Sequence, residues 1–210
     1  MTKYLEIEWY GRTGQEVLAT AAVLAEVLAM EGKYVQTVPG FNSEKNSVIF
    51  QAYNRLSEVP VRVHSAITAA DIVVIMDPTM VLNTNTDLKT NAKENAVYII
   101  NTSAAPGLIK EKLVVPGNHI FTLDTHKVAR EESGNGIAIP NIPLITVLIH
   151  WIAWISIETF KQRLRQSLSL FLNLNADRAA ANIKSVDRVP GEFKKSNNTE
   201  LTSINSNWES

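Results

Sequence analysis

The sequence contains no cysteine among its 210 residues. A chain without thiols forms no disulfide framework, no thiolate metal site and no cysteine-ligated iron–sulfur cluster of its own. An excess of either charge is also missing, since 20 lysines and arginines balance 21 acidic residues to give a net charge of −1. Nucleic-acid binding requires a basic field, so the composition argues against a nucleic-acid partner.

Long hydrophobic runs are missing as well. The longest, Ile142–Ile157, contains Pro143, Thr146, His150 and Ser156. It falls short of the roughly 20 residues of a membrane-spanning helix, so it predicts a buried helix and no membrane partner. Charged residues stand near the start where a signal segment would be apolar, so a cytoplasmic location is expected.

Strand-like and helix-like segments alternate over the first two thirds of the chain, which predicts an α/β fold with a doubly wound, mostly parallel sheet. The β-branched run Ala70–Met76 is typical of a central parallel strand buried on both faces. The remaining predicted strands are residues 4–10, 35–38, 47–53, 96–100 and 119–123.

The last third predicts a helical section. Asn141, Ser156 and Asn175 each begin a helix, and Ser and Asn are common N-caps. From Gly191 the composition turns to Ser, Asn, Lys and Glu. We therefore expect one domain over residues 1–190 and a flexible polar tail over 191–210, disordered or ordered only by a partner.

The opening unit contains the Gly11–Gln15 turn, at the carboxyl end of the first strand, where α/β sheets usually bind ligands. One interpretation is that the turn holds a phosphate. The other is a tight connection in which Gly11 and Gly14 serve backbone geometry. The carboxylate of Glu16 would repel a phosphate, and no acidic residue ends a second strand as a dinucleotide fingerprint requires. The residues alone favour the tight connection.

The helix that follows is unusually apolar, because only Thr20 and Glu26 are polar between Val17 and Met30. A helix lying on a sheet normally keeps one polar face in water. An apolar helix of this kind predicts that a partner subunit covers its outer side.

No catalytic residues and no metal ligands are predicted. Asp77-Pro78 follows a buried strand and favours a turn or helix cap. Glu44 and Lys45 fit a solvated loop, and His150 fits a hydrogen-bonded core histidine. The histidines have no partner at ligand spacing, and they stand at His64, His119, His126 and His150. A ligand-binding fold without chemical machinery indicates one subunit of a larger assembly.

A family resemblance adds to this interpretation. The segment Glu6–Gln15 resembles the E-I-R-W-H-G-R-G-G-Q-G opening of the gamma subunit of pyruvate:ferredoxin oxidoreductase and related 2-oxoacid:ferredoxin oxidoreductases. Glu31–Tyr34 is similar to the family's E-G-K-Y. Similarity continues in order over about residues 3–188, through the segments Pro39–Ser47, Val61–Ser65, Asp71–Pro78, Ile99–Thr102, Asp124–Asn135 and Ser156–Leu164.

The resemblance implies a gamma subunit of an enzyme that oxidatively decarboxylates a 2-oxoacid such as pyruvate. Thiamine diphosphate, Mg²⁺ and [4Fe–4S] clusters then belong to the alpha, beta and delta subunits, electrons pass to ferredoxin, and coenzyme A accepts the acyl group. The resemblance places the turn beside coenzyme A, with Gly11, Arg12, Gly14 and Gln15 as the cofactor-binding candidates.

The chain departs from the family pattern where Thr13 and Glu16 replace glycines, and where Asn42 replaces the glycine after Phe41. These changes make close approach of a phosphate harder. The competing hypothesis is a stand-alone, flavodoxin-like protein that binds a small molecule without catalysis. An isolated chain that stays a monodisperse monomer would favour this second hypothesis, since an exposed apolar helix promotes aggregation.

Overall fold

The computed structural model describes residues 4–40, 49–82, 90–113, 119–131, 138–170 and 174–197. The chain divides into two compact units, Met1–Phe121 and Thr122–Ser210. The first unit holds most of the sheet and the opening strand–turn–helix segment. Among the helices in the described ranges, none is long and apolar enough to cross a bilayer.

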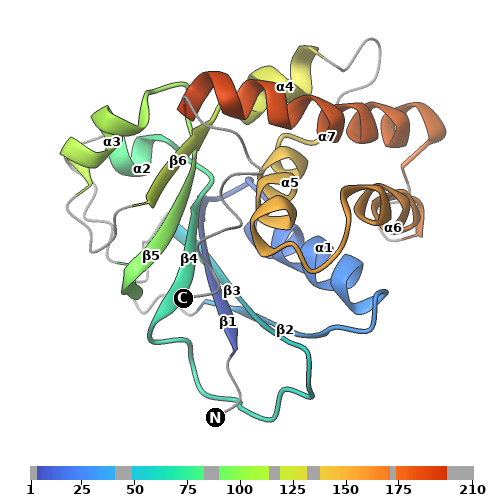
Figure 1. Ribbon diagram of the computed structural model, residues 1–210, viewed down its shortest axis with the longest axis horizontal. Helices are drawn as coiled ribbons and strands as arrows, with labels where there is room; N and C mark the ends of the chain where they lie inside the picture. The colour runs from blue at the N-terminus through green and yellow to red at the C-terminus, as the bar shows by residue number, and fades with distance from the viewer. Residues whose placement is uncertain are drawn as a thin grey trace. The chain divides into compact units, whose positions relative to one another are not determined.

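Six strands form one mixed sheet in the order β2-β3-β1-β4-β5-β6 (Figure 1). Strand β4 pairs in parallel with β1, and β5 pairs in parallel with β4. Strand β3 runs antiparallel to both β1 and β2. The predicted α/β fold with a mostly parallel sheet is confirmed, and the strands are β1 Leu5–Arg12, β2 Tyr34–Pro39, β3 Ile49–Ser57, β4 Ala70–Ile75, β5 Ala92–Asn101 and β6 His119–Leu123.

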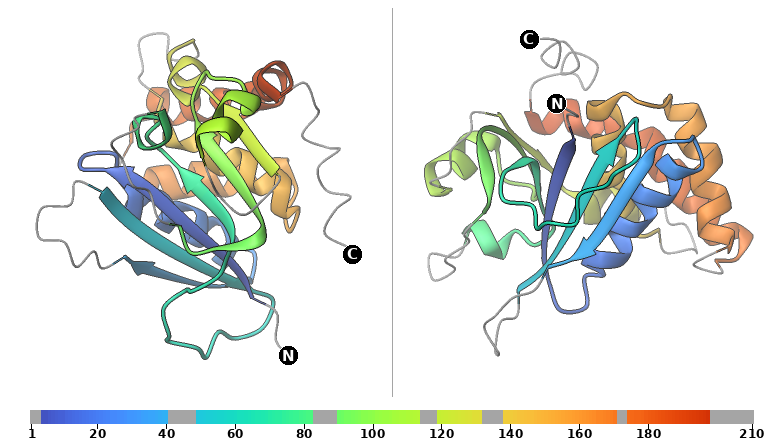
Figure 2. Two further views of the ribbon diagram at one scale, coloured as in Figure 1. Left: turned by 90° about the vertical axis from the view of Figure 1, so that its left-hand side faces the viewer. Right: turned by 90° about the horizontal axis from the view of Figure 1, so that it is seen from below.

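Helix α1 (Val17–Ala29) packs along the strands β1, β2 and β3 (Figure 2). The face beneath it carries alternate side chains of those strands. Trp9 Nε1 donates a hydrogen bond of 2.7 Å to Asn54 Oδ1, and Asn54 Nδ2 donates one of 3.2 Å to the carbonyl of Ala21. This polar link fixes α1 on the sheet, because each buried amide group has a partner.

The opposite face of the sheet packs against the helices α2 (Thr79–Leu82) and α3 (Pro106–Lys112). Tyr10 joins a buried cluster with Met80 of α2 and Ile109 of α3. Since Trp9 and Tyr10 are consecutive in β1, they point to opposite faces. The helices that follow β1 and β4 therefore lie on opposite faces, which is the arrangement of a topological switch point between these two strands.

A fully buried carboxylate, that of Glu8, lies on the Tyr10 face of β1. It accepts hydrogen bonds from the backbone N–H and the side-chain amide of Asn91 (2.9 and 3.1 Å), and its charge acts on the nearby tyrosines Tyr10 and Tyr53. Burial, followed by the nearby Glu8 charge, raises the pKa of Tyr53 to about 12 and also raises the pKa of Tyr10. The carboxylate ties the segment before β5 to β1.

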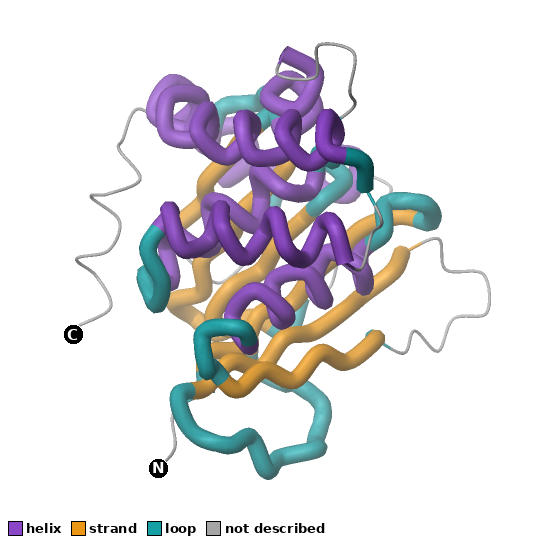
Figure 3. Tube along the Cα trace, turned by 90° about the vertical axis from the view of Figure 1, so that its right-hand side faces the viewer, coloured by secondary structure: helices purple, strands orange, loops and turns teal. Residues whose placement is uncertain are grey.

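The second unit is helical, as predicted, and its helices pack against one another around α7 (Figure 3). The backbone N–H of Thr159 donates a hydrogen bond of 3.0 Å to Ser156 Oγ, and that of Arg178 donates one of 2.9 Å to Asn175 Oδ1. Ser156 and Asn175 therefore cap their helices as predicted, whereas the helix that begins at Asn141 has Pro140 at its N-cap position and no side-chain capping bond. The helices are α4 Thr125–Glu131, α5 Asn141–Ile152, α6 Ile157–Leu170 and α7 Ala176–Asn197.

Helix α7 extends past Gly191, where the sequence predicts the start of a flexible tail. That prediction is wrong for residues 191–197. Phe193 is fully buried, and the Asn197 side chain bonds both the N–H and the C=O of Thr122 at 2.9 and 2.8 Å. The burial of Phe193 and the hydrogen bonds of Asn197 thus hold this segment in a helix despite its polar composition. The rest of the predicted tail, residues 198–210, lies outside the described residues, and the single domain over 1–190 stays a prediction.

Candidate functional site

The candidate site is built at the carboxyl end of β1. Gly11 and Arg12 are the last residues of this strand rather than part of a turn, because β3 reaches far enough to pair Phe50 with Gly11 and Ile49 with Arg12. The turn itself begins at Thr13. The predicted Gly11–Gln15 turn therefore starts two residues too early. Arg12 has a strand backbone and is the last residue of β1 that pairs with β3.

Gln15 closes the turn with both ends of its side-chain amide. Its Oε1 accepts a hydrogen bond of 2.8 Å from the backbone N–H of Arg12, and its Nε2 donates one of 2.9 Å to Asp77 Oδ2. Asp77 follows β4, so the amide joins the ends of two neighbouring parallel strands. Gln15 thus braces the turn, in addition to any contact with a ligand.

Asp77 collects several donors at this point. Its Oδ1 accepts hydrogen bonds from the backbone N–H of Thr79 at 2.8 Å and from the Thr79 hydroxyl. The predicted role of Asp77 as a helix cap is therefore confirmed. Its links to Gln15 and Arg12 escape sequence reasoning, because a cap motif predicts only local contacts.

Arg12 is anchored along one edge of its guanidinium group. Nε donates a hydrogen bond of 3.0 Å to Thr79 Oγ1 and lies 3.5 Å from Asp77 Oδ2. No residue in the described part of the chain accepts a hydrogen bond from Nη1 or Nη2. The Arg12 side chain is 30% exposed, so a molecule from the solvent can reach it.

Glu16 has a left-handed backbone, with φ of 54°, and its side chain makes no capping hydrogen bond to α1. This conformation favours glycine, which explains physically why glycine would suit this position. Gly14 also has a positive φ, of 85°. Gly11 is needed for space instead, since an added Cβ would lie 2.6 Å from Val17 Cγ2.

A groove of about 430 Å³ opens beside the turn, between the start of α1, the end of β2 and the start of β3. Its walls are largely apolar, and the side chains of Leu18 and Phe50 are 45% and 51% exposed. Arg12 is the cation among its lining residues and Glu16 the carboxylate. Such a groove suits a ligand with an apolar or amide body and one anionic or carbonyl group near Arg12. Of the four predicted site residues, Arg12 and Gly14 line the groove, whereas Gly11 and Gln15 support it.

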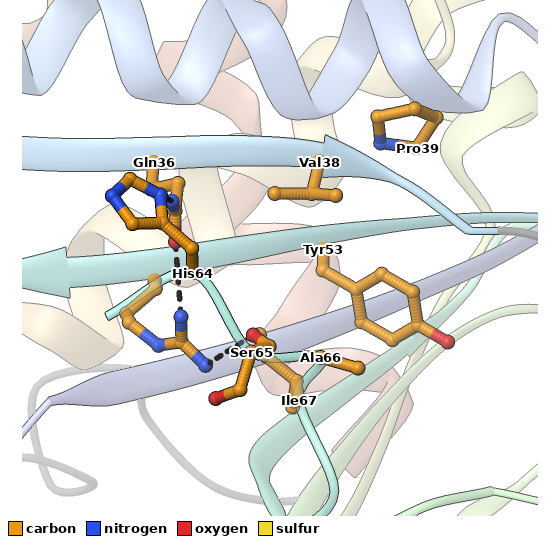
Figure 4. Close-up of a pocket in the computed structure, with 9 residues that line it drawn as sticks. Gln36, Val38, Pro39, Tyr53, His64, Ser65, Ala66 and Ile67 are labelled. Carbon is orange, nitrogen blue, oxygen red and sulfur yellow. Dashed lines mark hydrogen bonds between the residues drawn. The ribbon is translucent and has the colours of Figure 1, made fainter. Parts of the chain in front are cut away.

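A second cavity, of about 270 Å³, lies between the strands β2 and β3 and the loop that follows β3 (Figure 4). The buried guanidinium of Arg55 lines it and donates to Gln36 Oε1 at 2.9 Å and to the carbonyl of Ser65 at 3.2 Å. Arg55 also pairs with Glu6 at 2.7 Å, which offsets its charge. The sequence gives no sign of this cavity, because the loop residues come together only through long-range contacts.

Groups for chemical catalysis do not assemble in the described residues. No three His, Asp or Glu side chains among them are placed to hold a metal ion. His150, predicted as a hydrogen-bonded core residue, instead has a buried Nε2 without a hydrogen-bond partner in the described part of the chain. Burial lowers the pKa of His150, which favours a neutral imidazole in the fold.

The fold and the groove describe an α/β subunit with a groove at the carboxyl end of β1. No reactive set of side chains assembles in the described residues. The chain belongs to the pyruvate ferredoxin/flavodoxin oxidoreductase family, whose model matches residues 6–187. This match confirms the resemblance drawn from the sequence motifs, and it confirms that the chain is an oxidoreductase subunit at the level of its family.

Individual relatives agree with this assignment. Subunit PorC of pyruvate synthase from Thermotoga maritima is 29% identical over 78% of this chain and 82% of its own length. The common gamma subunit of the pyruvate/ketoisovalerate oxidoreductases of Pyrococcus abyssi is 29% identical over 79% of this chain and 87% of its own. The crystal structure of PORC from Thermotoga maritima matches with a TM-score of 0.71 and 25% identity, over 90% of this chain and 97% of that one.

A more distant structure shares the fold alone. The 2-oxoglutarate:ferredoxin oxidoreductase of Magnetococcus marinus, solved with 2-oxoglutarate, coenzyme A and succinyl-CoA bound, matches with a TM-score of 0.61 at 15% identity. The match covers 95% of this chain and 32% of that longer one. The loop around Glu44 and Lys45, which carries part of the sequence resemblance, lies outside the described residues.

Proposed function

We propose that this chain is the gamma subunit of a cytoplasmic, thiamine diphosphate-dependent 2-oxoacid:ferredoxin oxidoreductase, with pyruvate as the favoured 2-oxoacid. The family match over residues 6–187 carries the proposal. The alpha, beta and delta subunits hold thiamine diphosphate, Mg²⁺ and the [4Fe–4S] clusters, and ferredoxin takes the electrons. The absence of cysteine agrees with clusters that are bound by other chains.

The outer side of α1 supports the assembly. Val17, Leu24 and Leu28 are buried against the sheet, whereas Leu18 is 45% exposed and Ala22 is also exposed. An apolar stripe left in water is unfavourable for a free chain. We therefore place a partner subunit against this side of α1.

The groove beside Arg12 is the proposed contact with coenzyme A. The unused Nη edge of Arg12 can donate to one phosphate or carbonyl oxygen, and planar guanidinium groups bind such oxygens well. The exposed Leu18 and Phe50 side chains fit the apolar and amide parts of a pantetheine arm. The carboxylate of Glu16 lines the same groove and would repel a second anionic group of the ligand, so the groove favours one anionic group near Arg12.

Purification of the native assembly tests the subunit assignment. We expect this chain to co-purify with a thiamine-dependent subunit and an iron–sulfur subunit. Recovery of the chain alone, as a monodisperse monomer without these partners, would overturn the assignment and favour a stand-alone binding protein.

Steady-state kinetics of that assembly test the contact with coenzyme A. Arg12→Gln should raise the Michaelis constant for coenzyme A roughly tenfold, the usual cost of one charge-assisted hydrogen bond. Glu16→Gly should lower it, because the opposing carboxylate is gone. Glu111→Gln on α3 is the matched control and should leave the Michaelis constant for coenzyme A unchanged. An unchanged Michaelis constant in Arg12→Gln would end the proposed contact.

A further inference from the structure

We infer that Asp77 is a positioning residue, which holds Arg12 so that its Nη edge faces the groove. The inference rests on the proposed contact between the groove and coenzyme A. It goes beyond that contact, because Asp77 does not line the groove and acts only through another side chain.

The geometry around Asp77 carries the argument. One carboxylate, 8% exposed, receives the Thr79 N–H, the Thr79 hydroxyl and the Gln15 amide, and lies 3.5 Å from Arg12 Nε. Because the Thr79 hydroxyl donates its proton to Asp77, its oxygen is left to accept from Arg12 Nε at 3.0 Å. Asp77 therefore fixes both the charge and the hydrogen-bond direction that orient the guanidinium.

Because Thr79 and Asp77 hold Nε of Arg12, its remaining donors Nη1 and Nη2 are oriented before a ligand binds. A free arginine side chain samples many rotamers, and ordering it on binding costs free energy. In this fold the Nε edge is already held, while Nη1 and Nη2 have no acceptor in the described residues. The side chain is thus preorganised, which strengthens binding without adding a contact to the ligand.

The placement of the pair also fits the sheet. Arg12 ends β1, and Asp77 follows β4 directly. These strands are neighbours and parallel, with Tyr10 opposite Ile75. The switch point between them is therefore where one strand supplies the ligand-facing group and the next supplies its anchor.

The test is a double-mutant cycle in the purified holoenzyme, with Michaelis constant and kcat for coenzyme A as readouts. Asp77→Asn keeps the size of the side chain and an acceptor oxygen for the Thr79 N–H. We expect it to raise the Michaelis constant roughly fivefold with kcat unchanged. In an Arg12→Gln background the same change should have no further effect, because its route to the ligand is gone.

A second variant guards against misfolding. Thr79→Val preserves the shape of the side chain but removes the oxygen that accepts from Arg12, so it should raise the Michaelis constant in the same way. Cryo-electron microscopy of the Asp77→Asn assembly should show the Arg12 guanidinium displaced from Thr79. An Arg12 guanidinium that stays in place would overturn the inference.

The outcomes separate this inference from the proposed function. If Arg12→Gln raises the Michaelis constant while Asp77→Asn leaves it unchanged, or adds the same factor in both backgrounds, the inference fails and the coenzyme A contact stands. If Arg12→Gln itself changes nothing, the proposed contact fails and the inference fails with it. Equal loss of kcat in all variants would indicate a structural role and would likewise overturn positioning.

Discussion

Gln15 Nε2 donates a hydrogen bond of 2.9 Å to Asp77 Oδ2, although the two residues are 62 positions apart in the sequence. The same amide accepts the backbone N–H of Arg12. One side chain thereby closes the turn after β1 and connects it to the end of β4. The shape of the turn beside the groove therefore depends on the ends of both strands and not on one loop alone.

Gln15→Ala should therefore destabilise the first unit. The change leaves the N–H of Arg12 and the carboxylate of Asp77 each short of a partner, at a cost of about 1–3 kcal/mol. Urea denaturation followed by tryptophan fluorescence measures this loss. Gln162→Ala, at an exposed position of α6, is the control and should stay within about 0.5 kcal/mol of the parent chain. Equal effects of the two changes would refute the bracing role.

Glu16→Gly should stabilise the chain even though it removes a side chain. The left-handed backbone at Glu16, with φ of 54°, costs a residue with a Cβ about 1–2 kcal/mol. Part of this gain is lost to the greater freedom of glycine in the unfolded chain, so the expected net gain is about 0.5–1 kcal/mol.

Glu111→Gly is the contrasting control for this prediction. Glu111 lies in the right-handed helix α3 and is exposed. Glycine there should destabilise by about 0.5–1 kcal/mol. The same substitution at two glutamates should thus shift the urea midpoint in opposite directions, and a shift in the same direction at both positions would remove backbone strain as the explanation.

Stability should fall at alkaline pH because of the tyrosines around Glu8. Burial raises the pKa of Tyr53 from 10.0 to about 12, and Tyr10 is shifted in the same direction. The unfolded chain therefore loses protons near pH 10 while the folded chain keeps them. The stabilising contribution is complete below pH 10 and is lost as the pH rises towards 12 and above.

The measurement is the free energy of unfolding between pH 8 and pH 11.5. Tyr53→Phe and Tyr10→Phe should each flatten the alkaline decline, because each removes one group that titrates differently in the two states. Tyr34→Phe, at an exposed position of β2, is the comparison and should leave the decline unchanged. A parent-like decline in the double variant would show that other groups control the alkaline unfolding.

The order of strands and helices could be predicted because the spacing of apolar residues along the chain indicates each element locally. The β-branched run at β4 and the caps at Ser156 and Asn175 depend on neighbouring residues alone. Family motifs then supplied the assignment, which spacing and composition do not contain. Local rules were thus sufficient for the six strands and for the class of fold, whereas the short helices α2 and α3 were not predicted.

The site was predicted less completely, for physical reasons. Glu8 is charged, so a single strand gives no reason to expect it fully buried, and its partners come from β3 and from the segment before β5. The extent of β1 depends on where β3 begins, because pairing with Ile49 shifts Arg12 from a turn into a strand. The Gln15–Asp77 link needs the pairing of β1 with β4 before it exists. Each of these features comes from long-range pairing.

Phe193 shows where composition misleads, and it gives the last prediction. The segment from Gly191 is polar, and Pro190 lies inside α7, yet Phe193 is fully buried. Phe193→Ala should cost about 3–5 kcal/mol, as for other buried phenylalanines. Lys184→Ala, at an exposed position of the same helix, should change the free energy of unfolding little, as urea denaturation would measure. Removal of a side chain that is packed in the core lowers the free energy of unfolding, because its apolar surface no longer leaves water on folding. A Phe193 variant as stable as the Lys184 variant would therefore show that the segment after Gly191 is only loosely held.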